Sequence, residues 1–297
     1  MRMDPHLLRT LVAVVEHRSF SAAAQALGYT QSAVSQHIAA LEADLGAKLV
    51  ERRPVGPTAA GERLMEHARP LLLRLDAARA DLARLHTVRT TSLTVVCTPA
   101  ALTPSLAAAL ARVRRAAPGL AAGVRVLGPG EVVRAVVTGE ADLGLVDGAA
   151  APNDPLPLPD AGPMVTVTVA EEPLAVLLPA GHPLAGRAAL RLADLADAHW
   201  IDAPDTAVPL AQLRAAAHAD GFRPRLAYGG SDLRGLARLV AAGHGLVATG
   251  LTAAAGEPGT VAVRVRAPRL VHRTEAVHPR TPAGPVPALV EALGHTG

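Results

Sequence analysis

The sequence predicts an α/β protein that is preceded by an all-α N-terminal segment. Residues 19–42 form two short helical stretches separated by a tight turn. Residues 64–85 carry apolar side chains at alternating spacings of four and three, which is typical of a long helix with one apolar seam. From residue 92 onward, short apolar runs alternate with amphipathic stretches. This alternation predicts parallel strands with helices on both faces of the sheet.

The N-terminal segment is expected to contain three helices. The first spans Asp4 to His17, and Pro5 suits its first turn because the missing N–H is not needed there. In the following pair, Gly28 and Tyr29 end one helix because glycine adopts turn conformations at little cost. Thr30 is then expected to cap the next helix, since its hydroxyl can accept an unpaired backbone N–H.

The helix that follows Thr30 has two different faces. Val34, Ile38 and Leu41 lie on one side at helical spacing and are expected to face inward. The opposite side carries small and amide side chains without charge, namely Ser32, Ser35, Gln36 and Ala39. Serine and glutamine can hydrogen-bond with base edges, and alanine allows close approach. An ordinary helical hairpin is the alternative, but the uncharged polar face favours a recognition helix.

This stretch resembles the DNA-binding helix-turn-helix of the LysR-type transcriptional regulators. The matching residues run from the first helix to the start of the long helix: Leu7, Leu11, Val14, Ser19 to Ala23, Leu27, Gln31 to Ser35, Ile38, Leu41, Glu42, Leu45, Gly46, Leu49, Arg52, Thr58 and Gly61. Two features depart from the family pattern. Val50 stands where phenylalanine is common, and the predicted wing, Arg52 to Thr58, is shorter than usual and lacks basic residues at its tip. The fold is expected to tolerate both, and contact of the wing with the minor groove is left open.

The resemblance implies which side chains meet double-stranded promoter DNA. Ser32, Ser35 and Gln36 are expected to meet base edges. The phosphate contacts are expected from Thr30, Gln31, Arg52 and Arg53.

The long helix is predicted to link two parts of the chain and to dimerise. Its seam consists of Leu64, Ala68, Leu71, Leu75, Ala78, Leu82 and Leu85. At 1.5 Å per residue the seam would span roughly 40 Å. A helix packed only on its own domain is the alternative, but no element nearby in sequence would cover so long a stripe.

Charge and cysteine content narrow the possible classes. Residues 1–90 contain 12 Lys and Arg against 9 Asp and Glu, and residues 91–297 contain 17 of each, so the net charge of +3 lies in the N-terminal part. This distribution is expected if that part meets phosphate. The single cysteine, Cys97, excludes an intramolecular disulfide and a cysteine-based zinc site. Without an apolar signal region or membrane helix, a cytoplasmic location without membrane contact is expected.

The C-terminal part is expected to contain two α/β units. Strands are predicted over 92–97, 123–128 and 141–147, with helices over 104–117 and 131–138 between them. The proline-rich tract 151–163 is a predicted break or crossing strand, and residues 165–186 are expected to open the second unit. The family resemblance continues through Thr138 to Leu143, His182 to Leu184, Leu192 to Leu195, Trp200 to Ile201 and Leu239 to Leu246.

The resemblance implies a two-lobed, periplasmic-binding-protein-like effector domain behind a winged helix-turn-helix. The expected limits are 1–58 for the DNA-binding domain, 59–90 for the linker helix and 91–297 for the effector domain. Within the effector domain, lobe 1 is expected at about 91–160 and 269–297, and lobe 2 at about 161–268. The chain would cross between the lobes near residues 160 and 268.

Several sequence patterns resemble catalytic, cofactor-binding or metal-binding motifs, but each has an ordinary structural alternative. Gly243 to Ala248 fits a dinucleotide-binding pattern, but a helix precedes it and a strand follows, so a glycine at a helix C-terminus is favoured. Cys97 ends an apolar strand, which favours a small core residue over a nucleophile or redox sensor. The adjacent Glu171 and Glu172 lie in an extended run and should point to opposite faces. The histidines show no metal-ligand spacing. No catalytic group, metal site or cofactor is therefore predicted, and the chain is not expected to be an enzyme.

A small-molecule effector site is expected in the cleft between the lobes. In paired α/β lobes, ligands lie at the carboxyl ends of strands and at helix N-termini. In this sequence those places are Thr98, Pro99, Ala100, Gly128, Pro129, Asp147, Asp202, Ala203, Pro204 and Ser231. Thr98 is the leading candidate, although a turn or cap role is the alternative for each residue. Asp147, Asp202 and Asp232 would oppose a carboxylate, so a neutral, polar or cationic effector is favoured.

The sequence is therefore identified as a member of the LysR-type regulators. The resemblance implies a homodimer or homotetramer that binds inverted-repeat operator DNA, responds to an effector and contacts RNA polymerase. One alternative is an enzyme or solute-binding protein whose N-terminal helices serve only for oligomerisation. Another is a DNA-binding protein with a vestigial cleft.

Overall fold

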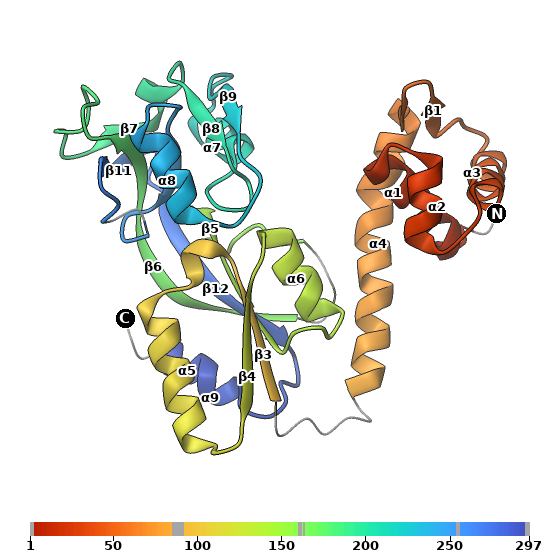
Figure 1. The fold of residues 1–297 in the computed structure, drawn as a ribbon, viewed down its shortest axis with the longest axis horizontal. Coiled ribbons are helices and arrows are strands. Elements are labelled where there is room, and N and C mark those ends of the chain that lie inside the picture. Colours follow the sequence, from red (N-terminus) through yellow and green to blue (C-terminus); the bar gives the residue numbers. More distant parts are fainter. Residues whose placement is uncertain (1–2, 85–91, 160–161, 163, 254–255, 295–297) are drawn as a thin grey trace. The chain divides into compact units, whose positions relative to one another are not determined.

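The computed structural model describes residues 3–84, 92–159, 162, 164–253 and 256–294 (Figure 1). These residues form two compact units, and the first of them extends to Arg79. Among the described residues, none of the helices is both long enough and apolar enough to span a bilayer.

The first unit contains the three predicted N-terminal helices. They are α1 (Pro5–His17), α2 (Phe20–Leu27) and α3 (Gln31–Leu45). Each begins at a residue whose side chain accepts a backbone N–H of the first turn, namely Asp4, Ser19 and Thr30. Gly28 ends α2 with φ +71°, a conformation that glycine adopts without steric cost. The predicted cap at Thr30 and the predicted turn at Gly28 are confirmed.

A short hairpin and a long helix complete this unit. The strands β1 (Val50–Arg52) and β2 (Val55–Pro57) are antiparallel, and α4 (Ala59–Arg84) follows. Thr58 caps α4, because its hydroxyl accepts the N–H of Gly61 at 3.0 Å. A Cβ atom at residue 61 would lie 2.1 Å from the backbone oxygen of Leu49, so the start of α4 requires glycine there.

The apolar seam of α4 has two differently covered parts. Ala68 is buried in the core of the first three helices, and Leu64 packs against the same core. Leu71, Leu75 and Leu82 are 47%, 39% and 63% exposed. Packing on its own domain therefore explains the start of the seam but not its continuation. Leu85, the last predicted seam residue, lies outside the described residues.

The second unit begins with a parallel βαβαβ arrangement. Its strands are β3 (Ser92–Cys97), β4 (Ala121–Val126) and β5 (Leu143–Ala150), in the order β4-β3-β5. The helices are α5 (Pro104–Ala116), α6 (Pro129–Val137) and α9 (Val286–Gly294). Helices α5 and α9 share a core with Leu143 and Leu145, whereas Val132 and Val136 of α6 pack at Gly144 on the other face. The predicted parallel sheet with helices on both faces is confirmed.

One long strand, β6 (Met164–Pro179), belongs to two parts of the sheet. Residues 164–173 pair with β12 (Val271–Pro279), whereas residues 174–179 pair with β10 (Val247–Gly250) and β11 (Thr260–Ala267). The expectation that residues 165–186 open the second α/β unit is therefore wrong for 165–173. Both halves are extended, but residues 164–173 alternate in polarity and end in Glu171 and Glu172, whereas residues 174–178 form a continuous buried apolar run. The pairing partner changes where this pattern changes.

The remaining elements build a second core around Trp200. They are β7 (Leu190–Arg191), the 3-10 helix η2 (Leu192–Leu195), β8 (Trp200–Asp202), α7 (Leu210–Ala217), β9 (Pro224–Ala227) and α8 (Leu233–Ala241). A further 3-10 helix, η1, spans Pro99–Ala101. The Trp200 ring is fully buried against Phe222, and its N–H donates to the Leu195 oxygen at 2.9 Å. Gly243, with φ +83°, follows α8, which confirms the helix C-terminal glycine.

Candidate DNA-binding surface and ligand cavity

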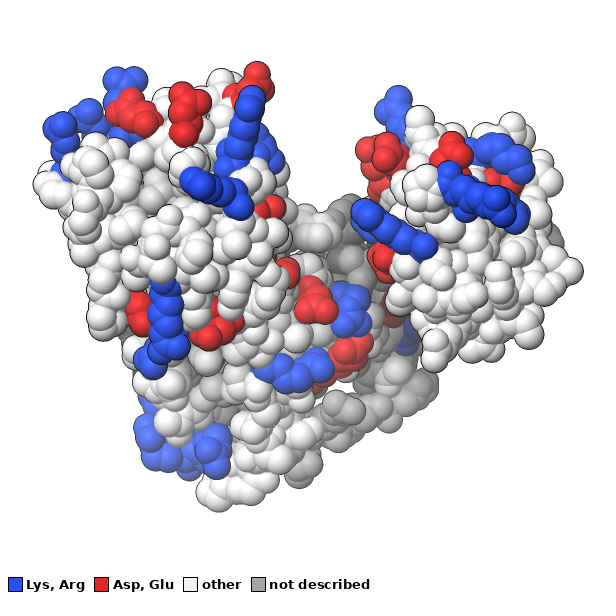
Figure 2. Space-filling view, turned by 45° about the horizontal axis from the view of Figure 1, so that its top comes forward, with Lys and Arg blue, Asp and Glu red and all other residues white. Residues whose placement is uncertain are grey.

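Helix α3 presents the predicted polar face to solvent. Val34, Ile38 and Leu41 are buried against α1 and α2, while Ser32 and Gln36 are exposed and Ser35 is half-buried. The inward direction of the three apolar residues is therefore confirmed. On the face drawn in Figure 2, most of the surface of the first unit is uncharged, and its Lys and Arg side chains occupy only a few places.

The other predicted DNA-binding residues lie at the start of α3 and in the hairpin. The Thr30 hydroxyl accepts the N–H of Ala33 at 3.2 Å, and Gln31 accepts a hydrogen bond from Ser21 of α2. The Arg52 guanidinium lies 5.4 Å from the centre of the Phe20 ring, a cation–π distance that restricts its side chain. Arg53 is exposed in the turn between β1 and β2.

Glu42 links α3 to the hairpin. From the sequence, Glu42 was identified only as a residue that matches the family pattern, and this role was not predicted. Its carboxylate is 8% exposed and accepts the N–H groups of Leu49 at 2.9 Å and Val50 at 3.4 Å. Burial alone would raise the Glu42 pKa, but these hydrogen bonds and the neighbouring Lys48 outweigh it and lower the pKa. The ionised carboxylate therefore places the start of β1 relative to α3.

Replacing Glu42 by alanine is expected to lower the free energy of unfolding by about 2–3 kcal/mol, because two backbone N–H groups lose their acceptor. Lys48→Ala is expected to cost less than about 1 kcal/mol, since the Lys48 side chain is 81% exposed. Urea unfolding followed by circular dichroism measures both. The Glu42 contribution is present above the carboxyl's unfolded pKa of 4.5 and is lost as the pH falls. Asp44→Ala, an exposed position on α3, is the control, and an equal loss there would contradict the role of Glu42.

An aromatic cluster lies beside the start of α3. The Tyr29 hydroxyl is 2.8 Å from Nε2 of His6, and both rings contact the ring of His37 on α3. Tyr29 is 41% exposed. From the sequence, Tyr29 is predicted only as a turn residue, because its partners His6 and His37 come from separate helices.

The second unit contains a cavity of about 290 Å³. Of the predicted effector residues, four line it: Thr98, Pro129, Asp147 and Pro204. Ala100 and Ala203 are instead buried in the surrounding core, and Gly128 lies next to the cavity against Asp205. Pro99, Asp202 and Ser231 are also outside its lining. The prediction from strand ends thus located residues that follow β3, β4 and β8, together with Asp147 inside β5, but it did not separate lining side chains from packed ones.

Two stretches of the cavity wall were not predicted. Residues 156–159 come from the proline-rich tract, and residues 207–209 with Gln212 come from the segment before α7 and from its first turn. The tract is fastened from β12: the Leu156 N–H donates to Glu275 at 3.0 Å, and Arg273 donates to the Asp154 backbone oxygen. Such irregular segments have no periodic pattern, so the sequence gives little signal for their position.

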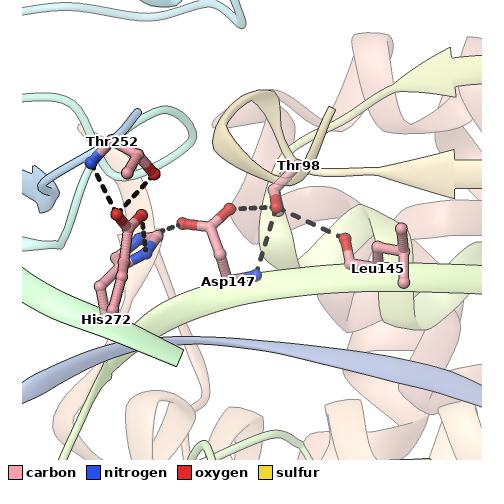
Figure 3. A network of polar contacts seen from close by, with 6 residues as sticks. Thr98, Leu145, Asp147, Thr252 and His272 are labelled. Atoms are coloured by element: carbon pink, nitrogen blue, oxygen red, sulfur yellow. Dashed lines mark hydrogen bonds and ion pairs between the residues drawn. The ribbon is translucent and has the colours of Figure 1, made fainter. Parts of the chain in front are cut away.

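A chain of polar contacts leads away from the cavity at Asp147 (Figure 3). The Thr98 hydroxyl donates to Asp147 Oδ1, and Asp147 Oδ2 lies 2.7 Å from His272 Nε2. On its other side, His272 Nδ1 is 3.6 Å from Glu172 Oε1. Glu172 in turn accepts hydrogen bonds from the backbone N–H and the hydroxyl of Thr252, at 2.6 and 2.5 Å. The network thus connects the cavity wall with the segment that follows β10.

The histidine in this network is positively charged at neutral pH. His272 is 3% exposed, and burial by itself lowers the pKa of its imidazole. The hydrogen bonds and charges of Asp147 and Glu172 outweigh that effect and raise the pKa to about 9. Glu171, the neighbour of Glu172, pairs instead with Arg273 at 2.7 Å. The prediction that the two adjacent glutamates point to opposite faces is therefore confirmed.

The single cysteine is a core residue. The Cys97 side chain is fully buried, and burial together with the charge of Asp147 raises the pKa of its thiol to about 11. A thiol in this environment is a poor nucleophile at neutral pH, which confirms the structural role. Among the described residues, no group of three or more His, Cys, Asp or Glu side chains is arranged to bind a metal ion.

An exposed recognition helix in one unit and a cavity in an α/β unit together define the class of helix-turn-helix proteins with a ligand-binding module. Residues 5–62 match the family model of the bacterial regulatory helix-turn-helix protein, lysR family, and residues 86–295 match the LysR substrate binding domain. The chain belongs to the LysR family and is a LysR-type transcriptional regulator, as the resemblance in its sequence predicted.

Relatives and solved structures agree with this assignment. The small neutral protease regulatory protein of Streptomyces coelicolor is 33% identical over 82% of this chain and 72% of its own length. A probable hydrogen peroxide-inducible genes activator of Mycobacterium avium is 35% identical over 64% of this chain and 59% of its own length. The full-length BenM structure has a TM-score of 0.55 at 22% identity, covering 99% of this chain and 96% of BenM. This last likeness concerns the fold alone.

Proposed function

We propose that this regulator binds inverted-repeat promoter DNA through α3 and that a small-molecule effector in the cavity changes this binding. The observation that carries the DNA-binding part is the face of α3, where small and amide side chains point to solvent while the opposite face is fixed in the core. Such a face can approach base edges closely without desolvating a charge. The cavity supports the effector part, because its lining combines apolar side chains with a few polar groups.

Individual contacts follow from the positions of the side chains. We propose that Ser32, Ser35 and Gln36 contact base edges in the major groove. Phosphate contacts are assigned to Thr30, Gln31, Arg52 and Arg53, which lie at the start of α3 or in the hairpin. Because only a two-residue turn, Arg53 and Pro54, joins β1 and β2, its reach toward the minor groove is short.

The proposed domain limits remain close to those expected from the sequence. We assign residues 1–58 to the winged helix-turn-helix, 59–90 to the linker helix and 91–297 to the effector domain. Within the effector domain, the first crossing between lobes is placed inside β6 near residue 174, since residues 164–173 pair with β12. Lobe 2 then starts later than 161 and ends near 268, where the chain passes from β11 to β12.

The exposed continuation of the α4 seam supports a homodimer or a homotetramer. Leu71, Leu75 and Leu82 form an apolar stripe at heptad spacing, which a second copy of α4 would cover. A dimer would place two copies of α3 on the two halves of an inverted repeat. In this proposal the regulator acts in the cytoplasm and affects transcription through contact with RNA polymerase.

The name of the Mycobacterium avium relative refers to hydrogen peroxide, but we do not propose a response to peroxide for this chain. Thiol-based peroxide sensing needs an accessible cysteine with a lowered pKa. Cys97 is fully buried, its pKa is raised to about 11, and the sequence contains no second cysteine.

Gln36→Ala is expected to weaken binding to the operator by roughly 1–3 kcal/mol while leaving non-specific binding nearly unchanged, because base-edge contacts discriminate between sequences. Arg53→Ala is expected to weaken both and to reduce the salt slope by about one unit. Fluorescence anisotropy with the promoter region next to the protein's own gene, a scrambled duplex and a salt series measures both effects. Equal losses on both duplexes for Gln36→Ala would remove Gln36 from base recognition. Absence of any DNA binding at low salt would overturn the proposed function.

A further inference from the structure

We propose that the cavity of the second unit takes a small ligand with a cationic group, such as an amine or amidine, joined to an apolar body. This inference rests on the proposed function, in which the cavity is the effector site. It adds the chemical class of the ligand, which follows from the charges, donors and acceptors that the lining presents.

The charged side chains of the described lining are acidic. Asp147 and Asp205 contribute carboxylates, and among the described residues the lining contains no Lys, Arg or His. His272, behind Asp147, is shared between Asp147 and Glu172, so this group combines one positive charge with two negative ones. A cationic ligand group would balance the remaining negative charge, whereas a carboxylate ligand would add to it.

The helix terminus at the cavity is already faced by a carboxylate of the chain. Helix α6 starts at Pro129, and the free N–H groups of a helix start normally attract anions. Here Asp205 lies against the residue before that helix. A Cβ atom at Gly128 would be 2.4 Å from Asp205 Oδ1. An anionic ligand at this terminus would therefore meet the Asp205 carboxylate at the same place.

Apart from the Gly130 N–H in the first turn of α6 and the amide group of Gln212, the hydrogen-bond donors of the lining are few or already used. Five lining residues are prolines, which have no N–H: Pro129, Pro157, Pro159, Pro204 and Pro209. The Thr98 hydroxyl donates to Asp147, and the Thr206 hydroxyl donates to the Gly230 backbone oxygen. In contrast, the buried Oε1 of Gln212 is an acceptor without a partner in the described part of the chain. The lining thus offers acceptors to a donor-rich ligand group.

The rest of the wall suits an apolar body. Leu156, Leu158, Val146 and Val208 line the cavity together with the prolines, and the described lining has no aromatic ring. A volume of about 290 Å³ is at the lower end of the range for small-molecule sites. These features favour a compact ligand with one charged end.

Benzamidine, benzamide and benzoate test the proposal, because they have nearly the same shape and carry charges of +1, 0 and −1. Isothermal titration calorimetry and thermal shift with the full-length chain at pH 7 give the affinity of each. Benzamidine is expected to bind about tenfold or more tighter than benzamide, since it gains attraction to Asp147 and Asp205. Benzoate is expected to bind most weakly.

Two variants and their controls locate the site. Asp205→Asn is expected to reduce the preference for benzamidine over benzamide, whereas Asp197→Asn, an exposed aspartate outside the lining, should leave it unchanged. Gly130→Leu should block binding, because Gly130 is part of the cavity lining and a Cβ atom there meets no atom within 4 Å, so the backbone can accept the larger residue. Gly123→Leu, on the exposed strand β4, is the control for that substitution.

Three results would overturn the proposal. If benzoate bound as tightly as benzamidine or more tightly, and Gly130→Leu abolished that binding, the cavity would be a ligand site but the proposed ligand charge would be wrong. If Asp205→Asn and Gly130→Leu left benzamidine binding unchanged, the ligand would bind outside the cavity. If no probe bound at millimolar concentration, the proposal would also be wrong. The proposed function is tested separately by operator binding, so specific DNA binding without benzamidine binding would reject only the ligand class.

Discussion

His272→Gln is expected to lower the free energy of unfolding by about 3 kcal/mol or more. The substitution removes the positive charge between Asp147 and Glu172 and leaves two partly buried carboxylates without their shared partner. For a unit of this size the loss corresponds to a decrease in Tm of roughly 6–12 °C, which thermal unfolding followed by circular dichroism at pH 7 measures. A decrease of less than about 1 kcal/mol would show that the network adds little to stability.

The pH dependence provides a second readout of the same substitution. The folded pKa of His272, about 9, lies above the ordinary value of 6.5. Its contribution to stability is therefore complete below pH 6.5 and is lost as the pH rises through about 9. The Tm of the wild type should fall over this range, and His272→Gln should lack that part of the decrease. The matched control is His244→Gln, an exposed histidine of the same unit, which should retain the wild-type profile.

Leu75→Glu combined with Leu82→Glu is expected to convert the regulator to monomers and to lower its operator affinity by roughly 100-fold or more. The two leucines belong to the exposed stripe on α4, where a charge in a paired seam would be buried without a partner. A monomer can engage only one half of an inverted repeat and loses the gain from linked binding. Size-exclusion chromatography with light scattering measures the mass, and anisotropy measures the affinity.

His67→Glu is the control for this pair of substitutions, because it places a glutamate at an exposed position of α4 outside the seam. It should leave the oligomer intact. If the double variant kept both its oligomeric mass and its operator affinity, the seam would not be the dimer interface.

The sequence predicted the features that depend on near neighbours. Thr30 caps the helix whose first turn follows it directly, and Val34, Ile38 and Leu41 point inward because a helix repeats every 3.6 residues. The parallel order of β3, β4 and β5 also followed from local alternation of apolar runs. Each of these needs only a short window of sequence.

The cavity and its network depend on residues that are distant in sequence. His272 meets Asp147 across 125 positions, and Thr252 meets Glu172 across 80. The register of β5, β6 and β12 brings Asp147, Glu172 and His272 together, and the pairing of β10 with β6 adds Thr252. The same reason explains why Glu172 was assigned no role and why the wall at 156–159 was not predicted. A rule about strand ends located the region but not the side chains that fill it.

The continuity of β6 limits how the two parts of its sheet can move. Its residues 164–173 and 174–179 are joined without a break, so one part cannot slide past the other while the strand remains paired. The remaining motion is a rotation about β6. A few dihedral angles near Pro173 and Leu174 and in the 268–270 connection would change during this rotation. Glu172 and His272 lie next to that axis. A ligand in the cavity would therefore change the angle of rotation about β6. A small change in this angle would produce a large displacement at the far ends of the strands.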